Sequence, residues 1–154
     1  MPNPKRQQSK RARTLNRGKP GKEQGPFVTW LPVPDRRIGP NSRSHWRVKA
    51  KLVKEAREGA FISAIEILGP RSMRWMCWHE VTARATFHFP DRRRRDSDNL
   101  AALLKPVWDG LVDAGLLIDD DRITHLPVEI VHERGCTPVV KIEVWDDTGA
   151  LRAS

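Results

Sequence analysis

The stretch EVTARATFHFPDRRRRDSDNLAALLKPVWDGL, residues 80–111, combines a strand pattern with a helix pattern. Over residues 80–89 apolar and polar side chains alternate, which is typical of a strand with one buried face. Apolar residues then recur at helical spacing, at positions 100, 103, 104, 107, 108 and 111. We expect Asp98 or Asn99 to cap this helix and Gly115 to end it.

The sequence on either side predicts further strands and one more helix. Residues 27–33 form a strand pattern, and residues 48–68 carry a helical stripe of apolar positions. Residues 116–121 form a short extended piece, and two more strand patterns, 123–133 and 138–146, are expected to pair as a hairpin. The order β-α-β-α-β-β predicts an α/β (α+β) fold, with two helices packed on a small mixed β-sheet.

The positive charge is concentrated in the N-terminal segment. Residues 1–26 hold eight Lys or Arg against Glu23 alone, so this segment carries +7 of the net +9. Its few large apolar residues predict a disordered basic arm, followed by one folded domain over residues 27–154. We interpret the arm as a nucleic-acid tether, with a solubilising tail or low-complexity sequence as the alternatives.

Several protein classes are disfavoured by the sequence. No apolar run approaches the length of a membrane span, and no signal-peptide pattern follows the N-terminus, so we expect a soluble cytoplasmic protein without a membrane partner. Cys77 and Cys136 do not form a C-x-x-C motif. We expect two buried free thiols rather than a disulfide framework or a zinc site.

Two clusters of carboxylates flank the predicted second helix. Asp96 and Asp98 precede it, and Asp119, Asp120 and Asp121 follow it. In an extended segment, residues two apart point the same way, with Cα atoms about 6.5 Å apart. Converging carboxylates repel by about 4 kcal/mol at 4 Å and an effective dielectric near 20, so they need a cation. Hard oxygen ligands suit Mg²⁺ or Mn²⁺.

A simpler interpretation of the same residues stays open at this point. Asp98 or Asn99 would cap the helix, the second cluster would form a solvated turn, and the neighbouring arginines would neutralise both. A D-x-D spacing alone is a weak signal, because sugar transferases also use it, and it leaves both interpretations open.

The segment PDRRRRDSDNL…KPVWDGLVDAGLLIDDDRI, from Pro90 to about Ile123, resembles the signature of the RusA family of Holliday-junction resolvases. That signature reads R-D-x-D-N-x-x-K-x-x-x-D-x-L and continues with a glycine and an acidic pair. A looser similarity covers GPNSRSHW (39–46), where the family has a Pro/Asn-rich loop before its first helix. The resemblance implies a RusA-like fold.

The resemblance also implies the residues of an active site. Asp96, Asp98 and Asp120 would hold the Mg²⁺ that cleavage needs, with Mn²⁺ as a possible substitute, and Lys105 would be the functional lysine. Because the acidic pair is followed by a further aspartate, Asp119 or Asp121 could replace Asp120 as the third ligand.

Lys105 departs from the family spacing. It follows Asp98 by seven residues rather than four, which adds about one helical turn, or about 4.5 Å. Pro106 either kinks the helix at this point or lies in the first turn of a helix that begins at Lys105. Asp109 is expected to pair with Lys105 at i+4 and orient it.

The function implied by the resemblance is Mg²⁺-dependent resolution of four-way DNA junctions by paired nicks, in recombination and repair. The arginines that would neutralise the flanking phosphates are Arg92, Arg93, Arg94 and Arg95. Paired nicks imply a homodimer, for which a sheet edge or the Trp-bearing segment 73–78 could supply the interface. A non-enzymatic DNA-binding module and a basic RNA- or ribosome-associated protein are the alternatives, and neither accounts for both acidic clusters.

Overall fold

The computed structural model of the protein describes residues 26–69 and 77–147. The predicted arm therefore lies outside the described residues except for Pro26, as do residues 73–76 of the Trp-bearing segment. The elements in chain order are β1 (Phe27–Pro32), η1 (Arg36–Ile38), α2 (Trp46–Leu68), β2 (Val81–Phe89), α3 (Ser97–Leu103), α4 (Lys105–Asp113), η2 (Asp120–Arg122), β3 (Ile123–His125), β4 (Glu129–His132) and β5 (Val139–Asp146).

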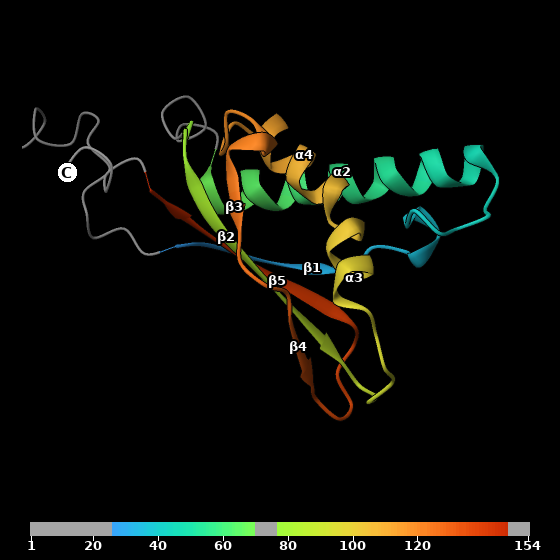
Figure 1. Cartoon of the computed structure of the whole chain (residues 1–154). Helices are drawn as coiled ribbons and strands as arrows, with labels where there is room; N and C mark the ends of the chain where they lie inside the picture. Colours follow the sequence, from blue (N-terminus) through green and yellow to red (C-terminus); the bar gives the residue numbers. More distant parts are fainter. Residues whose placement is uncertain (1–25, 70–76, 148–154) are drawn as a thin grey trace, which may run out of the picture.

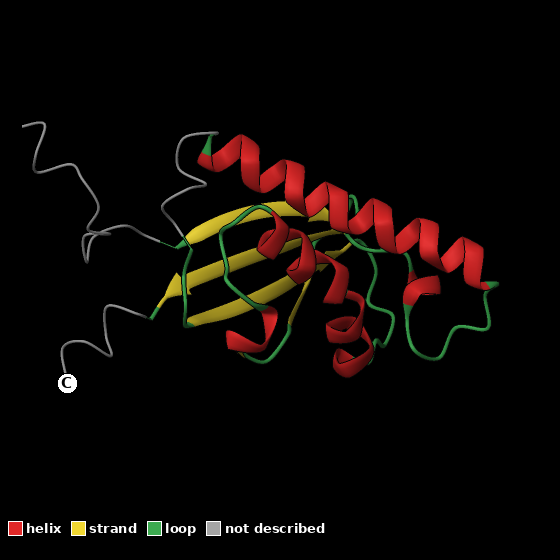
Figure 2. Cartoon of the chain, turned by 90° about the horizontal axis from the view of Figure 1, so that it is seen from above, coloured by secondary structure: helices red, strands yellow, loops and turns green. Residues whose placement is uncertain are grey.

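The strands form one mixed sheet, as predicted. β5 lies between β1 and β2 and runs antiparallel to both, while β3 and β4 pair in parallel with the other edge of β2 (Figure 1). The helices lie on one face of this sheet, and α2 runs across it packed against α4 (Figure 2). The α/β (α+β) class and the two-helix layer are therefore confirmed, although the second helix is interrupted.

The predicted hairpin between residues 123–133 and 138–146 is wrong. The first of these segments forms two short strands, β3 and β4, and β5 pairs with β1 and β2 instead of β4. Burial explains the difference. Alternate residues of β5 (Val140, Ile142 and Val144) are fully buried and none of its residues is exposed, as expected of a strand with a neighbour on each side. β4 is short and mostly exposed, which suits an edge strand.

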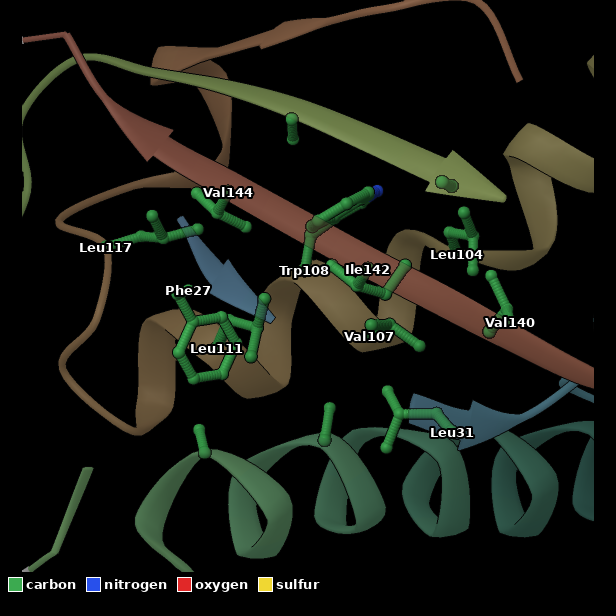
Figure 3. Close-up of a cluster of buried hydrophobic side chains, with 14 of the residues drawn as sticks. Phe27, Leu31, Leu104, Val107, Trp108, Leu111, Leu117, Val140, Ile142 and Val144 are labelled. Atoms are coloured by element: carbon green, nitrogen blue, oxygen red, sulfur yellow. The ribbon is translucent and has the colours of Figure 1, made fainter. Parts of the chain in front are cut away.

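The hydrophobic core lies between the sheet and the helices. All six apolar positions predicted for the second helix are buried. Figure 3 shows side chains of α4 directed toward β1 and β5, in a cluster that includes Phe27, Leu31, Val107, Trp108, Leu111, Val140, Ile142 and Val144. The periodicity of the sequence therefore identified the buried face correctly.

The predicted second helix is two helices that meet at Leu104. Leu104 donates its backbone N–H to Ala101 in a tightened last turn of α3, and α4 starts at Lys105 with Pro106 in its first turn. Proline has no N–H to continue the α-helical ladder, but it fits a first turn, where that N–H has no helical partner. The structure therefore confirms that Pro106 lies in the first turn of a helix that begins at Lys105 and does not kink a longer helix.

The structure also tests the predictions for Gly115, for the two cysteines and for Trp78. Gly115 follows the end of α4 with φ +79°, a left-handed conformation that favours glycine, so the predicted stop is confirmed. The prediction of buried thiols is wrong, because Cys77 is exposed and Cys136 is half-buried, although both are free. Trp78 is buried in the core, which removes it from a dimer interface.

No helix among the described residues has the length and apolarity needed to cross a membrane.

Candidate functional site

Asp96 is the residue that caps α3. Its backbone is extended, and its Oδ1 accepts a hydrogen bond from the backbone N–H of Asp98 at 2.9 Å. Its Oδ2 accepts a second bond from Nδ2 of Asn99 at 3.3 Å. The prediction that Asp98 or Asn99 is the cap is therefore wrong by two or three residues. An Asp at this position satisfies an otherwise unpaired N–H of the first turn.

Asp98 lies in the first turn of α3, not in an extended segment as expected. The assumption that the two carboxylates project from one strand-like segment is therefore wrong. The Asp98 side chain is exposed, and within residues 26–69 and 77–147 its carboxylate has neither a hydrogen bond nor an ion pair. Since an ionised carboxylate offers about four lone-pair sites, Asp98 is open to an external cation and Asp96 keeps part of that capacity.

Lys105 joins the second acidic cluster to the start of α4. Its Nζ donates to Oδ1 of Asp109 at 2.8 Å, one helical turn on, and also to Oδ2 of Asp120. The expected pairing of Lys105 with Asp109 is confirmed. The contact with Asp120 brings together two residues that are 15 positions apart in the sequence.

Lys105, Asp109 and Asp120 form a triad in which Lys105 and Asp120 stabilise each other's charged forms. The hydrogen bond with Asp109, followed by that with Asp120, raises the pKa of Lys105 above its ordinary value. The hydrogen bond from Lys105 is also the main cause that lowers the pKa of Asp120. A lysine held by two carboxylates has its ammonium fixed in position rather than free to sample solvent.

The three consecutive acids after α4 differ in their surroundings. Asp120, in η2, is half-buried and contacts Lys105. Asp121 is 73% exposed at its side chain and lies 3.8 Å from the guanidinium of Arg122. Asp119 is exposed and precedes η2 without capping it through its side chain. Of the three, Asp120 is therefore the one directed toward the lysine.

The carboxylates are divided into two groups, Asp96 with Asp98 and Asp109 with Asp120. Within the described parts of the chain, no three His, Cys, Asp or Glu side chains are arranged so that they could hold a metal ion. The donors are hard oxygens, which suit Mg²⁺ chemically. A site that combines Asp96, Asp98 and Asp120 requires these two groups to come together.

The four arginines before Asp96 have different environments. The Arg95 guanidinium lies 3.7 Å from the Phe89 ring centroid and 2.9 Å from Oδ1 of Asp91, so this arginine is part of the folded loop. Arg93 approaches Asp91 at 3.9 Å, and its backbone N–H is the main cause that lowers the Asp91 pKa. Arg92 and Arg94 are exposed, and no ion pair to either is found among the described residues.

A hollow of ≈ 1200 Å³ lies between residues 33–44 and residues 89–103. Figures 1 and 2 show the 33–44 loop, which contains η1, near α3. The polar and charged side chains that line the hollow are those of Asp35, Arg36, Arg37, Asn41, Ser42, Ser44, Arg93, Arg94, Arg95, Asp96 and Asn99. We name this hollow the arginine groove.

The binding residues predicted from the sequence do not include any from the first loop of the arginine groove, residues 33–44. Its two arginines, Arg36 and Arg37, stand in a Pro- and Gly-rich stretch, which was the available signal. That this loop faces residues 93–99 follows from tertiary packing.

The chain has a relative among known proteins. No family model matches the chain. The chain is 36% identical over 98 residues to a protein of Xylella fastidiosa (strain Temecula1 / ATCC 700964) that is described as an uncharacterized protein. The match covers 64% of this chain and 63% of the relative, so the chain spans less than two thirds of that protein's length.

Proposed function

We propose that the protein is a Mg²⁺-dependent, structure-selective endodeoxyribonuclease of the RusA type, which resolves four-way DNA junctions by paired nicks. The observation that carries the proposal is the contact between Lys105 and Asp120. The resemblance in the sequence assigns roles to these two residues, which are far apart along the chain. Their contact supports those roles, because a lysine and an acid that act on one phosphodiester must lie close together.

The proposed Mg²⁺, for which Mn²⁺ could substitute, would be held by Asp96, Asp98 and Asp120. When bound, Mg²⁺ supplies Lewis-acid activation of the phosphodiester and of water. Lys105 would stabilise negative charge that develops on the phosphate oxygens, and Asp109 would keep its ammonium in place. Arg92 and Arg94 would neutralise neighbouring phosphates, so that a polyanion can approach the carboxylates.

A second candidate function is a DNA-binding module without catalysis. The observation in its favour is that Lys105 already neutralises Asp109 and Asp120, so these acids also serve as partners of a structural cation. In this case the arginines would bind phosphate, and Mg²⁺ would have no effect on the DNA.

Cleavage assays with two substrates separate these candidates. The protein is incubated with a labelled four-way junction and with a linear duplex of equal sequence, each with Mg²⁺ or with EDTA. We expect cleavage of the junction in Mg²⁺, no cleavage in EDTA, and little cleavage of the duplex. Binding of the junction without any cleavage would support the non-enzymatic module, and equal cleavage of both substrates would leave a nuclease without junction selectivity.

We also propose that the active form is a C2 homodimer that acts on DNA in the cytoplasm. A four-way junction has approximate two-fold symmetry, and one active site per chain makes one nick. Two symmetry-related chains would therefore supply the paired cuts. Light scattering should give about twice the mass of the 17.6 kDa chain, whereas a monomer that retains paired cleavage would contradict this assembly.

Replacing Lys105 with Gln should separate metal binding from cleavage. The variant loses the cation that holds Asp120, so Mg²⁺ affinity should rise, by up to about five-fold if the lost ion pair is worth about 0.2–1 kcal/mol. Cleavage should fall, because the ammonium no longer stabilises charge on the phosphate. Calorimetric titration with Mg²⁺ measures the first effect and single-turnover kinetics the second.

The matched control for this substitution is Lys51→Gln. Lys51 is an exposed lysine of α2 that also pairs at i+4, with Glu55 at 3.9 Å, and it lies outside the proposed site. This variant should change neither the Mg²⁺ affinity nor the cleavage rate. A Lys105→Gln protein that binds Mg²⁺ no more tightly than the wild type would show that Asp120 does not become a metal ligand.

A further inference from the structure

We propose that the arginine groove binds the sugar-phosphate backbone of a single DNA strand, with Arg36 and Arg94 as phosphate ligands on its two walls. This inference rests on the proposed function as a DNA enzyme, and it specifies how the substrate lies on the protein. It adds the 33–44 loop, and Arg36 in particular, to the residues that contact DNA.

The groove is cationic on both sides. Five arginines and two aspartates line it, so positive charge is in excess. Arg37 is held by Asp35 through two hydrogen bonds, of 3.0 and 2.8 Å. Asp91 pairs with Arg95 at 2.9 Å and with Arg93 at 3.9 Å. Within the described parts of the chain, no hydrogen bond or ion pair engages the guanidinium of Arg36 or Arg94. These two exposed arginines are therefore the ones available for an external anion.

The 33–44 loop is held in place before any ligand binds. Asp35 caps η1 by accepting a hydrogen bond from the backbone N–H of Arg37 at 2.9 Å. The side-chain hydrogen bond from Arg37 is the main cause that lowers the pKa of Asp35 to about 2. Since Asp35 stays ionised at neutral pH, the pair keeps η1, and with it Arg36, in a fixed position.

A hydrogen-bond chain connects the two walls and ends at the proposed active site. Nδ2 of Asn41 donates to Oδ1 of Asn99 at 3.3 Å, and Nδ2 of Asn99 donates to Oδ2 of Asp96 at 3.3 Å. Asn41, Asn99 and Asp96 all line the groove. A strand that lies in the groove would therefore pass the carboxylate that is proposed to take part in cleavage.

The size of the groove favours one strand over two. Its volume of ≈ 1200 Å³ lies just above the roughly 300–1,000 Å³ of small-molecule pockets. It can hold a few nucleotides of one strand. An arginine on each wall suits a backbone that carries a phosphate on every nucleotide.

Binding of a fluorescent single-stranded oligonucleotide, measured by anisotropy in EDTA as a function of salt, tests this proposal. Arg36→Gln and Arg94→Gln should each reduce the slope of log K against log salt by about 0.7, the value for one phosphate contact to a single strand. That change corresponds to about four-fold weaker binding at about 0.15 M salt, and the double variant should show both losses. Both side chains are exposed, so thermal unfolding should stay at the wild-type temperature.

Arg43→Gln is the matched control. Arg43 is an exposed arginine of the same loop that does not line the groove, and its replacement removes the same charge. Binding to a duplex of equal sequence should fall less than binding to the single strand when Arg36 is replaced. The proposal is overturned if Arg36→Gln behaves like Arg43→Gln, if duplex binding falls as much, or if the wild type does not bind the single strand.

The outcome is independent of the nuclease assignment. If the junction is cleaved in Mg²⁺ but Arg36→Gln binds the single strand normally, the nuclease assignment is supported and the proposed role of the arginine groove is wrong. If Arg36 and Arg94 are needed for single-strand binding but no DNA is cleaved, the arginine groove is supported as the binding surface of a protein without nuclease activity.

Discussion

Replacing Asp96 or Asp98 with asparagine is expected to reduce junction cleavage by at least about 100-fold. Each substitution removes one negative oxygen ligand from the proposed Mg²⁺ site. Binding of the uncleaved junction should be unchanged or slightly tighter, because a negative charge near phosphate is lost. Single-turnover cleavage in Mg²⁺ and junction binding in EDTA measure the two effects separately.

These substitutions should leave the fold intact. Asn caps helices about as well as Asp, so Asp96→Asn keeps the hydrogen bond that starts α3. Asp98 is exposed in the first turn of α3, where the described chain gives its carboxylate no partner to lose. A loss of cleavage in either variant would therefore reflect chemistry and not unfolding, which thermal melts can verify.

Two further aspartates serve as comparisons. Asp120→Asn should also abolish cleavage, whereas Asp121→Asn should have little effect, because Asp121 is exposed and pairs only loosely with Arg122. If Asp121→Asn lost cleavage and Asp120→Asn did not, the third ligand would be Asp121. Wild-type cleavage by both Asp96→Asn and Asp98→Asn would show that these carboxylates do not hold a catalytic metal.

Gly110→Ala is expected to lower the free energy of unfolding by about 1–3 kcal/mol, even though alanine favours a helix by about 1 kcal/mol over glycine. A Cβ atom at this position would lie 2.3 Å from the carbonyl oxygen of Arg57 and 2.8 Å from Cβ of Ala60. Both neighbours belong to α2, so α2 and α4 would have to move apart. Urea denaturation followed by circular dichroism measures the change.

The same substitution at Gly59 should have the opposite sign. Gly59 lies in α2, and a Cβ there would meet no atom within 4 Å. Gly59→Ala should therefore raise the free energy of unfolding by up to about 1 kcal/mol. If Gly110→Ala is as stable as Gly59→Ala, the close approach of α2 and α4 is wrong. That would also displace Lys105 and Asp109, which α4 carries.

The sequence by itself determined the local elements and their buried faces. Alternation over residues 80–89 and the 3.6-residue period over residues 100–111 identified β2 and the core face of α3 and α4, because each pattern reflects which side of an element meets water. Spacing at i+4 also predicted the Lys105–Asp109 pair, since residues one turn apart on a helix are neighbours whatever surrounds them.

Tertiary structure alone decided which elements pack together and which distant side chains come into contact. β5 pairs with β1 on one side and with β2 on the other, and local pairing rules for hairpins do not contain that information. The contact of Lys105 with Asp120 joins residues that are distant in the sequence, and so does the hollow that both Arg36 and Arg94 line. Such contacts follow from how the helices pack on the sheet, which no local pattern encodes.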